Sequence, residues 1–349
     1  MNFAETKKIL ALLLGLLLTL VGTSQANHVV LHSGPFGGII LSIAVHPTNG
    51  KLLYLGAFGR GVFRSRAGGK VWVSANVGLE NLQVQSLVID PVTPSRLYAG
   101  TDGGVFRSTD GGDHWALASK QLADRNIRAL AIDPSTPATL YAGTDVGVFR
   151  SRDGGASWHA AGEGLTAKDV RALAINPQEP RIVYAATFGG VFKSRDEGNR
   201  WTTTGHGLTD QNIRTLILDP QKPSTLYAGA ATGGVFKSEN GGASWRPTNR
   251  GMGGQSVMSL VTLPSSSTIY AGTTAGLYKS DDAGSTWEPV EPDAFSLSIT
   301  ALAIDLRAPR TLYVGTGGLL FKTVDGGRNW SGVQWVIHPD LPFKDVVEK

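Results

Sequence analysis

A short octet that combines a hydroxyl, a carboxylate, two glycines and a tryptophan recurs along the chain, and its third copy, residues 151–158, reads SRDGGASW. In isolation, Asp153 of this copy could act as a catalytic acid or bind a metal ion, because carboxylates supply both kinds of chemistry. The chain has seven copies, at residues 65–72, 108–115, 151–158, 194–201, 238–245, 280–287 and 323–330. One catalytic acid does not require seven copies, so the repetition favours a structural turn.

The aspartate of the octet is predicted to stabilise its own turn. A carboxylate at this position can accept backbone N–H groups, as in an Asx-turn, and the glycines can adopt positive φ angles. Ala67 replaces this aspartate in the first copy and Asn240 replaces it in the fifth. A turn tolerates such replacements and a metal site does not, and the spacing also differs from that of an EF-hand loop. We therefore expect that Asp153 is neither catalytic nor a metal ligand.

Residues that differ between the repeats offer other chemistry. One aligned position, at the start of the first predicted strand, is occupied by Leu41, Gln85, Arg128, Arg171, Arg214, Met258 and Thr300. Three consecutive repeats thus place an arginine there, and guanidinium groups bind carboxylates and phosphates through planar forks of donors. The cluster predicts an anion-binding patch. Two alternatives stay open: Asp102, Asp145 and Asp169 could pair with the arginines and brace them, or the arginines could reflect recent duplication of repeats.

The loop after the second predicted strand supplies the other candidate ligand-binding residues, which are Arg60, Asp102, Asp145 and Phe188. Asp102 and Asp145 fall in adjacent repeats and could form the pair of carboxylates, about 5 to 9 Å apart, that a glycosidase needs. Glu163 is the one glutamate expected near these residues in the same repeats. Neither the histidines nor the glycine doublets form a pattern that indicates a metal or a phosphate cofactor.

The elements that must position these residues follow from the spacing of the octets. Successive octet tryptophans lie 43, 43, 43, 44, 42 and 43 residues apart, a period typical of propeller blades. The third repeat reads NIRALAIDP, TLYAGTD, GVFRSRDGG and SWHAAGEGL, which indicates four short strands separated by turns. We predict an all-β, seven-bladed propeller with four antiparallel strands per blade, an octet between the third and fourth strands, and blades from about residue 39 to about residue 338.

This fold would bring the candidate residues to one mouth of a central channel. The loops that enter the innermost strands and the loops between second and third strands share that face, while the octets lie on the opposite one. The sequence does not decide which strand closes the ring: the segment from Val29 to His32, residues 331–337, or both could complete the seventh blade.

Composition narrows the location and the partners. Residues 7 and 8 are lysines, an apolar run follows, and Ser24-Gln25-Ala26 resembles a peptidase site, so we expect a signal peptide at 1–26 and a single propeller domain at 27–349. An uncleaved anchor is the rival interpretation. The protein would then be periplasmic or extracellular, without a membrane span after cleavage. A net charge of +4 with no run of three basic residues argues against a nucleic-acid partner, and cysteine is absent.

The octet pattern, Ser/Thr-x-Asp-x-Gly-x-x-Trp, resembles the Asp-box, or BNR repeat, and the resemblance covers essentially the whole chain after residue 26. Asp-box propellers include sialidases, xyloglucan-degrading enzymes, sortilin-type receptors and photosystem II assembly factors, so the resemblance implies a fold rather than a function. A sialidase would need a tyrosine nucleophile, yet all eight tyrosines here occupy repeat positions.

We expect a monomeric, non-enzymatic binding or assembly-scaffold propeller, without a cofactor or metal, that recognises a protein or an anionic ligand at the channel mouth. The alternative is a glycoside hydrolase, like a sialidase or a xyloglucanase, or a carbohydrate-binding propeller.

Overall fold

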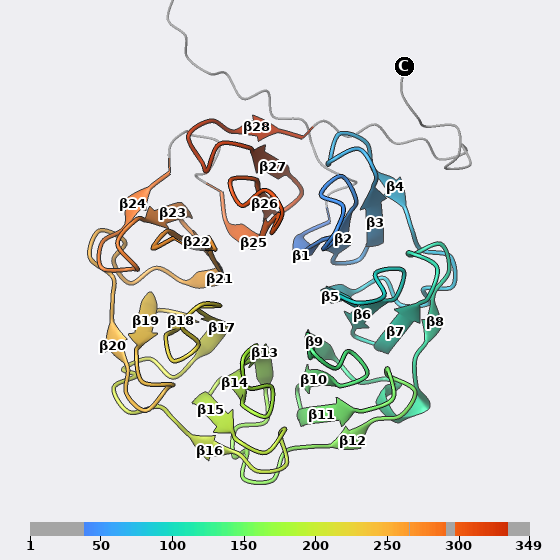
Figure 1. The fold of residues 1–349 in the computed structure, drawn as a ribbon, viewed down its shortest axis with the longest axis horizontal. Coiled ribbons are helices and arrows are strands. Elements are labelled where there is room, and N and C mark those ends of the chain that lie inside the picture. The colour runs from blue at the N-terminus through green and yellow to red at the C-terminus, as the bar shows by residue number, and fades with distance from the viewer. Residues whose placement is uncertain (1–37, 265, 291–296, 334–349) are drawn as a thin grey trace, which may run out of the picture. The chain divides into compact units, whose positions relative to one another are not determined.

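The computed structural model describes residues 38–264, 266–290 and 297–333, which all belong to the compact unit Leu31–Lys349. They form seven four-stranded antiparallel sheets arranged in a ring, with the first strand of each sheet nearest the central axis (Figure 1). This confirms the predicted seven-bladed propeller. The predicted signal peptide, residues 1–26, lies outside the described residues. Within the described ranges, no helix has the length and apolar character needed to cross a membrane.

Each blade takes its four strands consecutively from the chain. Their bounds are β1 (Ile40–Val45), β2 (Leu53–Ala57), β3 (Gly61–Ser65) and β4 (Val73–Ser74) in blade 1; β5 (Val84–Ile89), β6 (Leu97–Thr101), β7 (Gly104–Ser108) and β8 (Ala116–Leu117) in blade 2; β9 (Ile127–Ile132), β10 (Leu140–Thr144), β11 (Gly147–Ser151) and β12 (His159–Ala160) in blade 3; and β13 (Val170–Ile175), β14 (Val183–Thr187), β15 (Gly190–Ser194) and β16 (Thr202–Thr203) in blade 4. Blade 5 has β17 (Ile213–Leu218), β18 (Leu226–Ala230), β19 (Val235–Ser238) and β20 (Arg246–Pro247); blade 6 has β21 (Val257–Thr262), β22 (Ile269–Thr273), β23 (Gly276–Ser280) and β24 (Glu288–Pro289); blade 7 has β25 (Ile299–Ile304), β26 (Leu312–Thr316), β27 (Leu320–Thr323) and β28 (Ser331–Gly332). One 3₁₀ turn, η2 (Lys120–Leu122), precedes blade 3.

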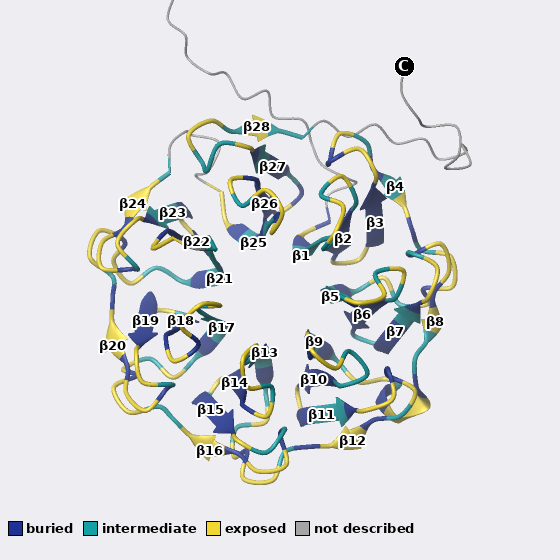
Figure 2. Ribbon diagram, viewed as in Figure 1, coloured by how far each residue is buried: buried dark blue, intermediate teal, exposed yellow. Residues whose placement is uncertain are grey.

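The second strand of every blade is buried along its whole length, whereas the short fourth strands carry the exposed positions at the outside of the ring (Figure 2). Close packing between blades depends on a small residue in the second strand. A Cβ atom on Gly143 of β10 would lie 2.7 Å from Val170 Cγ1 of the next blade. Six blades have glycine at this position and blade 4 has Ala186, so the first residue of each inner strand can pack closely against the preceding blade.

Every inner strand contains a β-bulge at its second residue. In blade 3, Ile127 pairs with Thr144 and Ala129 pairs with Gly143, which leaves Arg128 between them without a partner on β10. The bulged residues of the seven blades are Leu41, Gln85, Arg128, Arg171, Arg214, Met258 and Thr300. A bulge changes the direction of the side chain it carries. The aligned position that contains the three arginines is therefore one repeated backbone irregularity.

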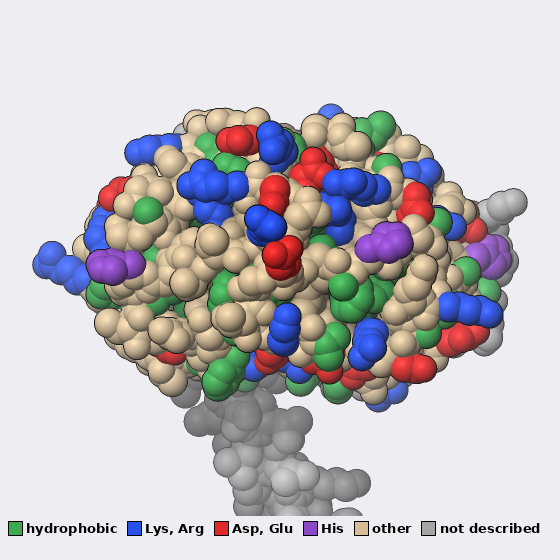
Figure 3. Space-filling view, turned by 90° about the horizontal axis from the view of Figure 1, so that it is seen from below, with side chains coloured by type: hydrophobic (Ala, Val, Ile, Leu, Met, Phe, Trp, Pro, Cys, Tyr) green, Lys and Arg blue, Asp and Glu red, His purple; other side chains and the backbone are tan. Residues whose placement is uncertain are grey.

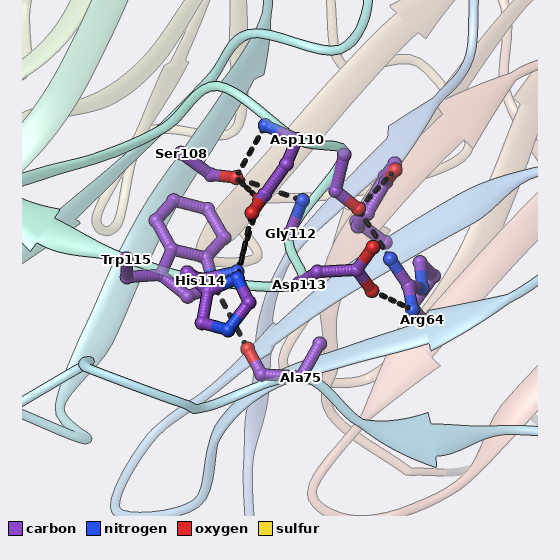
Figure 4. Close-up of polar contacts among 10 residues, drawn as sticks. Arg64, Ala75, Ser108, Asp110, Gly112, Asp113, His114 and Trp115 are labelled. Carbon is purple, nitrogen blue, oxygen red and sulfur yellow. Dashed lines mark hydrogen bonds and ion pairs between the residues drawn. The ribbon is translucent and has the colours of Figure 1, made fainter. Parts of the chain in front are cut away.

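The octets form the turns between third and fourth strands, as predicted, and Figure 4 shows the one in blade 2. Ser108 Oγ accepts a hydrogen bond from the Gly112 amide and donates one to Asp110 Oδ1, each at 2.8 Å. Asp110 Oδ1 also accepts the His114 amide at 2.9 Å, and the Trp115 indole donates to the Ala75 carbonyl of blade 1 at 2.8 Å. The aspartate thus stabilises the turn while the tryptophan joins the turn to its neighbour.

The octets also clamp adjacent blades through one carbonyl. The Tyr98 hydroxyl of β6 and Arg107 Nη1 of β7 donate to the Gly154 carbonyl of blade 3, at 2.9 and 3.1 Å. Tyr184 and Lys193 of blade 4 donate in the same way to the Gly241 carbonyl of blade 5, at 3.1 and 2.9 Å. The repeated tyrosine and the repeated basic residue of the third strand therefore have a structural role in blade assembly.

The ring closes between blades 7 and 1 through side chains. Ser331–Gly332 forms the outer strand of blade 7, so the predicted segment 331–337 does contribute a strand to this blade. The other candidate, the segment from Val29 to His32, lies outside the described residues. At this seam, Lys322 Nζ donates to the Gly68 carbonyl at 2.9 Å and Thr300 Oγ1 donates to the Ile40 carbonyl at 2.6 Å.

Candidate functional site

The bulged residues lie at the face of the ring where the inner strands begin, which we call the entry face. Thr144 at the end of β10 pairs with Ile127 at the start of β9, so the turn between second and third strands reaches the same face. Arg128, Arg171 and Arg214 are half-buried there, in the adjacent strands β9, β13 and β17. We call these three residues the arginine patch.

Two arginines of the patch share one carboxylate. Arg128 Nη1 donates to Asp169 Oδ1, and Arg171 donates to Asp169 Oδ2 through Nε at 3.2 Å and Nη2 at 3.1 Å. Arg171 Nη1 also donates to Asn212 Oδ1 at 3.2 Å. Bracing of the arginines by Asp169, one of the alternatives from the sequence, is therefore present for Arg128 and Arg171.

These contacts belong to a chain of hydrogen bonds that runs from blade to blade. The bulged side chain of one blade donates to the residue that precedes the inner strand of the next blade: Gln85 to Asn126, Arg128 to Asp169, and Arg171 to Asn212. The sequence analysis missed Asn126 and Asn212. A signal for them exists, because the residue before the inner strand is polar in six repeats, as Gln83, Asn126, Asp169, Asn212, Ser256 and Ser298.

Arg214 has different surroundings from the other two arginines. Arg214 occupies the same bulge position in its blade as Arg128 and Arg171 do in theirs. In the described part of the chain, however, no carboxylate lies within 4.0 Å of its guanidinium. Its Nη1 lies 3.5 Å from Met258 Sδ, a weak acceptor, and its buried Nε has no hydrogen-bond partner among the described residues. Because its guanidinium has no carboxylate partner in that part of the chain, Arg214 is the member of the patch that would gain most from an anion.

Asp210 precedes Arg214 in the sequence but serves the adjacent turn. Asp210 Oδ2 accepts the Thr232 amide and hydroxyl, each at 2.8 Å, and the Gly233 amide at 3.0 Å. Burial favours a higher pKa for Asp210, but hydrogen bonds from Asn212, Thr232 and Gly233 outweigh it and hold the pKa below its ordinary value. This carboxylate therefore has its acceptors already engaged by the loop between β18 and β19.

Asp102 and Asp145 do not pair with the arginines, contrary to the bracing alternative. Asp102 Oδ1 accepts a hydrogen bond from Gln85 Nε2, because blade 2 carries glutamine rather than arginine at its bulge. Asp145 is exposed in the turn between β10 and β11, and in the described residues it forms no ion pair within 4.0 Å. Their predicted role in ligand binding stays a prediction.

Glu163 lies elsewhere than expected. Its carbonyl accepts the Trp201 amide at 2.8 Å and its carboxylate lies 3.4 Å from Arg200 Nε, which places it beside the octet of blade 4 rather than at the entry face. The reason is that the loop after each fourth strand runs along the octet of the next blade.

Phe188 and Arg60 occupy the predicted turns but only Phe188 meets the patch. Phe188 is 59% exposed between β14 and β15, and Arg171 Cζ lies 5.6 Å from the centroid of its ring. Arg60 lies in blade 1, packed over Gly38, with blade 2 between it and Arg128. The structure therefore groups Phe188, and not Arg60, with the arginines.

Exposed apolar side chains occupy other blades of the same face. Three of them precede the inner strands of blades 7, 1 and 2, namely Leu297, Ile39 and Leu82. The fourth, Phe58, lies in the turn between β2 and β3 of blade 1, and each of the four is between 40 and 43% exposed. We call them the apolar arc. The entry face thus combines an arginine patch on blades 3 to 5 with apolar surface on blades 7, 1 and 2.

The charges of the described residues give little indication of acid–base chemistry. Every carboxyl pKa that is shifted is shifted downward, including those of Asp110, Asp153 and Asp282, whereas a general acid needs a raised pKa. Within the described ranges, no three His, Asp or Glu side chains gather as metal ligands would. On the side of the ring seen in Figure 3, basic and acidic side chains are intermixed.

Comparisons with known proteins support the architecture. No protein-family profile and no curated protein sequence matches the chain. Among solved structures, the chain is similar to the GH74 xyloglucanase of Xanthomonas campestris, with a TM-score of 0.70, 19% identity, and coverage of 88% of this chain and 55% of that one. It is also similar to YCF48 bound to D1 peptide, with a TM-score of 0.65, 16% identity, and coverage of 84% and 95%.

A third similar structure is YCF48 from Cyanidioschyzon merolae, with a TM-score of 0.63, 15% identity, and coverage of 86% of this chain and 98% of that one. The chain spans about half the length of the GH74 structures that it matches. Identities this low show the propeller fold alone. The neighbours include both glycoside hydrolases and YCF48, so the function has to be argued from the site.

Proposed function

We propose that this chain is a non-enzymatic binding propeller that holds an acidic segment of a partner protein against the arginine patch of its entry face. The observation that carries the proposal is a local imbalance of charge. Three guanidinium groups in adjacent bulges have one carboxylate, Asp169, within ion-pair distance among the described residues. A carboxylate from a partner would supply the acceptor that Arg214 lacks.

The surroundings of the patch favour a protein segment over a small anion. Phe188 is exposed beside Arg171, and the apolar arc offers further contact area across the face. Protein interfaces are enriched in arginine and aromatic residues and combine apolar with polar contacts. A partner that carries both acidic and apolar side chains would use both surfaces.

The comparisons support this proposal without deciding it. One propeller of similar fold and length, YCF48, has a structure described as bound to D1 peptide, so peptide binding is compatible with this architecture. The seven octets, five of which have the turn-stabilising aspartate, support membership of the Asp-box propellers. We also propose that the protein is exported with cleavage after Ala26, which N-terminal sequencing of the mature protein tests.

A binding experiment tests the patch. A fluorescein-labelled decapeptide of alternating glutamate and leucine should bind the intact protein, measured by fluorescence anisotropy at low ionic strength. Arg171→Ala and Arg214→Ala should each weaken binding at least tenfold, because each removes a donor fork from the patch. Arg152→Ala, which removes an exposed guanidinium on the octet side, is the matched control and should bind like the wild type.

Two outcomes would overturn the proposal. Equal affinity of the Arg171 and Arg214 variants and the wild type, with unchanged melting temperatures, would show that the patch does not bind the peptide. Hydrolysis of an oligosaccharide by the purified protein, abolished by Asp145→Ala, would establish the glycosidase alternative instead.

A further inference from the structure

A polar cavity of about 420 Å³ lies between blade 4 and the octet of blade 5, and none of the three patch arginines lines it. One wall consists of Lys193 from β15, Arg195 and the outer strand β16. The other wall consists of Asn240, Gly241 and Ala243 from the fifth octet. We call this cavity the 4/5 groove.

Two positive charges meet in the 4/5 groove without an ion pair. Lys193 is 8% exposed; its ammonium group donates to the Gly241 carbonyl at 2.9 Å and lies 5.1 Å from the centroid of the Tyr184 ring. Arg195 is exposed, and in the described ranges neither residue has a carboxylate within 4.0 Å. Burial, and then the charge of Arg195, lower the pKa of Lys193, while the more distant charge of Glu179 acts in the opposite direction.

The corresponding cations are neutralised in four other blades. The ion pairs there are Arg64 with Asp113, Arg150 and Arg152 with Glu197, Lys237 with Glu239, and Lys279 with Asp281. The fifth octet has Asn240 where five octets have aspartate, and Ala243 where the second octet has Asp113. The one carboxylate left in the fifth octet, that of Glu239, pairs with Lys237 and Arg246 rather than with Lys193 or Arg195. An anion in the groove would therefore supply the ion-pair partner that Lys193 and Arg195 lack among the described residues.

The rest of the lining has no carboxylate and combines polar side chains with glycines. Thr202, Thr203 and Thr204 form a row of hydroxyl groups, and His206 and Gln211 add an imidazole and an amide. Thr202 and Thr204 donate to the Lys193 and Val191 carbonyls at 3.3 Å, which leaves lone pairs on their oxygens. The groove of about 420 Å³ has room for many water molecules, each of which occupies about 30 Å³. A single small oxyanion would therefore leave most of it empty. The remaining space suits a body rich in hydroxyl groups.

We propose that the 4/5 groove binds an acidic saccharide. The sulfate or carboxylate group lies between Lys193 and Arg195, and the sugar hydroxyls exchange hydrogen bonds with the threonine row and Asn240. Arginine and lysine together favour such anions, and the volume lies within the range of about 300–1,000 Å³ typical of small-molecule sites. None of the three patch arginines lines the 4/5 groove, and its saccharide ligand goes beyond the proposed function.

Calorimetric titration of the intact protein tests the ligand class. The probes are a sulfated uronate–glucosamine disaccharide, the same disaccharide without sulfate, cellobiose and sodium sulfate. We expect at least one of the two acidic disaccharides to bind at least tenfold more tightly than sodium sulfate, and cellobiose not to bind. Their relative affinity shows whether sulfate or carboxylate is preferred. Equal affinity for sodium sulfate, or for cellobiose, would overturn the proposal.

Three variants test the location. Arg195→Gln and Asn240→Asp should each weaken binding of the acidic disaccharide at least tenfold; aspartate at position 240 restores the residue found in five octets, so this variant retains a turn that the fold accepts. Arg152→Gln, at the same octet position as Arg195 but paired with Glu197 at 2.6 Å, is the control that should bind normally. Unchanged binding in both groove variants would sink the assignment. Arg171→Ala should retain saccharide binding, so this proposal and the proposed function can fail separately.

Discussion

Arg128, Arg171 and Arg214 occupy the same bulge in three adjacent blades, yet they differ in what surrounds them. The first two share one carboxylate, that of Asp169, whereas the buried Nε of Arg214 has no acceptor among the described residues. Identical residues at equivalent positions can therefore have different energetic roles. The difference comes from the next blade, which presents Asp169 to Arg128, Asn212 to Arg171 and Met258 to Arg214.

This difference predicts opposite effects of two matching substitutions. Arg214→Met removes an unpaired donor and should leave the free energy of unfolding unchanged or raise it. Arg128→Met removes an ion pair with Asp169 and should lower the free energy of unfolding by about 1 kcal/mol. Urea unfolding followed by circular dichroism measures both. If Arg214→Met lowered the free energy of unfolding as much as Arg128→Met does, Arg214 would have a stabilising role at the entry face.

The octet aspartates predict a pH dependence. Partial burial favours a higher pKa for Asp153, but hydrogen bonds from Ser157 and Ser151 outweigh it and lower the pKa to about 2. A depressed pKa gives stability that is present above the unfolded pKa of about 3.9 and is lost as pH falls through the folded value. Asp153→Asn should therefore lower the melting temperature at pH 7, and the difference from wild type should shrink between pH 4 and pH 2.

Asp153→Ala extends this test. Alanine cannot accept a hydrogen bond from the Ser157 amide, whereas the side-chain oxygen of asparagine can, just as Asn240 Oδ1 accepts the Ser244 amide at 2.9 Å. The melting temperature of the Asp153→Ala variant should therefore lie below that of Asp153→Asn. A melting temperature of Asp153→Asn that stays lower than that of the wild type by the same amount down to pH 2 would contradict the titration of Asp153.

At the scale of the element, the octet is both a turn and a clamp. Its serine, aspartate and glycines organise the connection between third and fourth strands, and its central carbonyl receives donors from the preceding blade. The clamp is not complete everywhere. Among the described residues, the buried hydroxyl of Tyr313 has no hydrogen-bond partner, although Tyr98 and Tyr184 in the same repeat position each donate to a carbonyl.

Tyr98, whose hydroxyl has a partner, and Tyr313, whose hydroxyl has none among the described residues, allow a matched pair of substitutions. Tyr98→Phe removes the hydrogen bond to Gly154 and should lower the free energy of unfolding by about 1 kcal/mol. Tyr313→Phe removes a buried hydroxyl that has no partner among the described residues and should be neutral or stabilising. Equilibrium unfolding of the two variants tests this; a loss of stability in Tyr313→Phe equal to that in Tyr98→Phe would contradict the prediction.

The strands and octets could be predicted because they repeat. The tryptophan spacing indicated seven blades, and short runs such as TLYAGTD and GVFRSRDGG, separated by turn residues, indicated four strands in each. The bulge could not be predicted, since an extra residue in one strand depends on pairing with the next strand rather than on local sequence. The partner of Asp102 depends on the same bulge. Asp102 accepts a hydrogen bond from Gln85, the bulged residue of its own blade, and not from one of the arginines, and the sequence alone does not show this. Glu163 was misplaced because a loop without a repeat motif has no sequence signal for its direction.

At the scale of the whole molecule, the seam between blades 7 and 1 resembles the other boundaries in its contacts. Gly315 faces Ile40 as Gly143 faces Val170, and Lys322 reaches Gly68 as Lys193 reaches Gly241. The seam differs in one respect: the chain connects every other pair of neighbouring blades directly, and here no such link joins them. The described part of the seam therefore depends on side-chain packing and a few hydrogen bonds.

Hydrogen exchange should reveal this dependence. Amides of β1 and of β25 to β27 should exchange faster than the equivalent amides of β13 to β15, because separation at the seam requires no stretching of a connecting loop. Mass-spectrometric exchange on the native protein measures the contrast. Equal protection of all seven blades would indicate that some further part of the chain secures blades 7 and 1.

The contiguity of each blade has a consequence for how such a chain can change. When every blade is one uninterrupted segment of about 43 residues, moving the chain ends to another boundary, or duplicating a segment, cuts no sheet. A permuted chain that starts before β9, with its original ends joined by a flexible linker, should fold to the same ring. Genetic recombination at blade boundaries would then exchange binding surfaces, such as an arginine-bearing blade, while it leaves the four-stranded sheet of every blade intact.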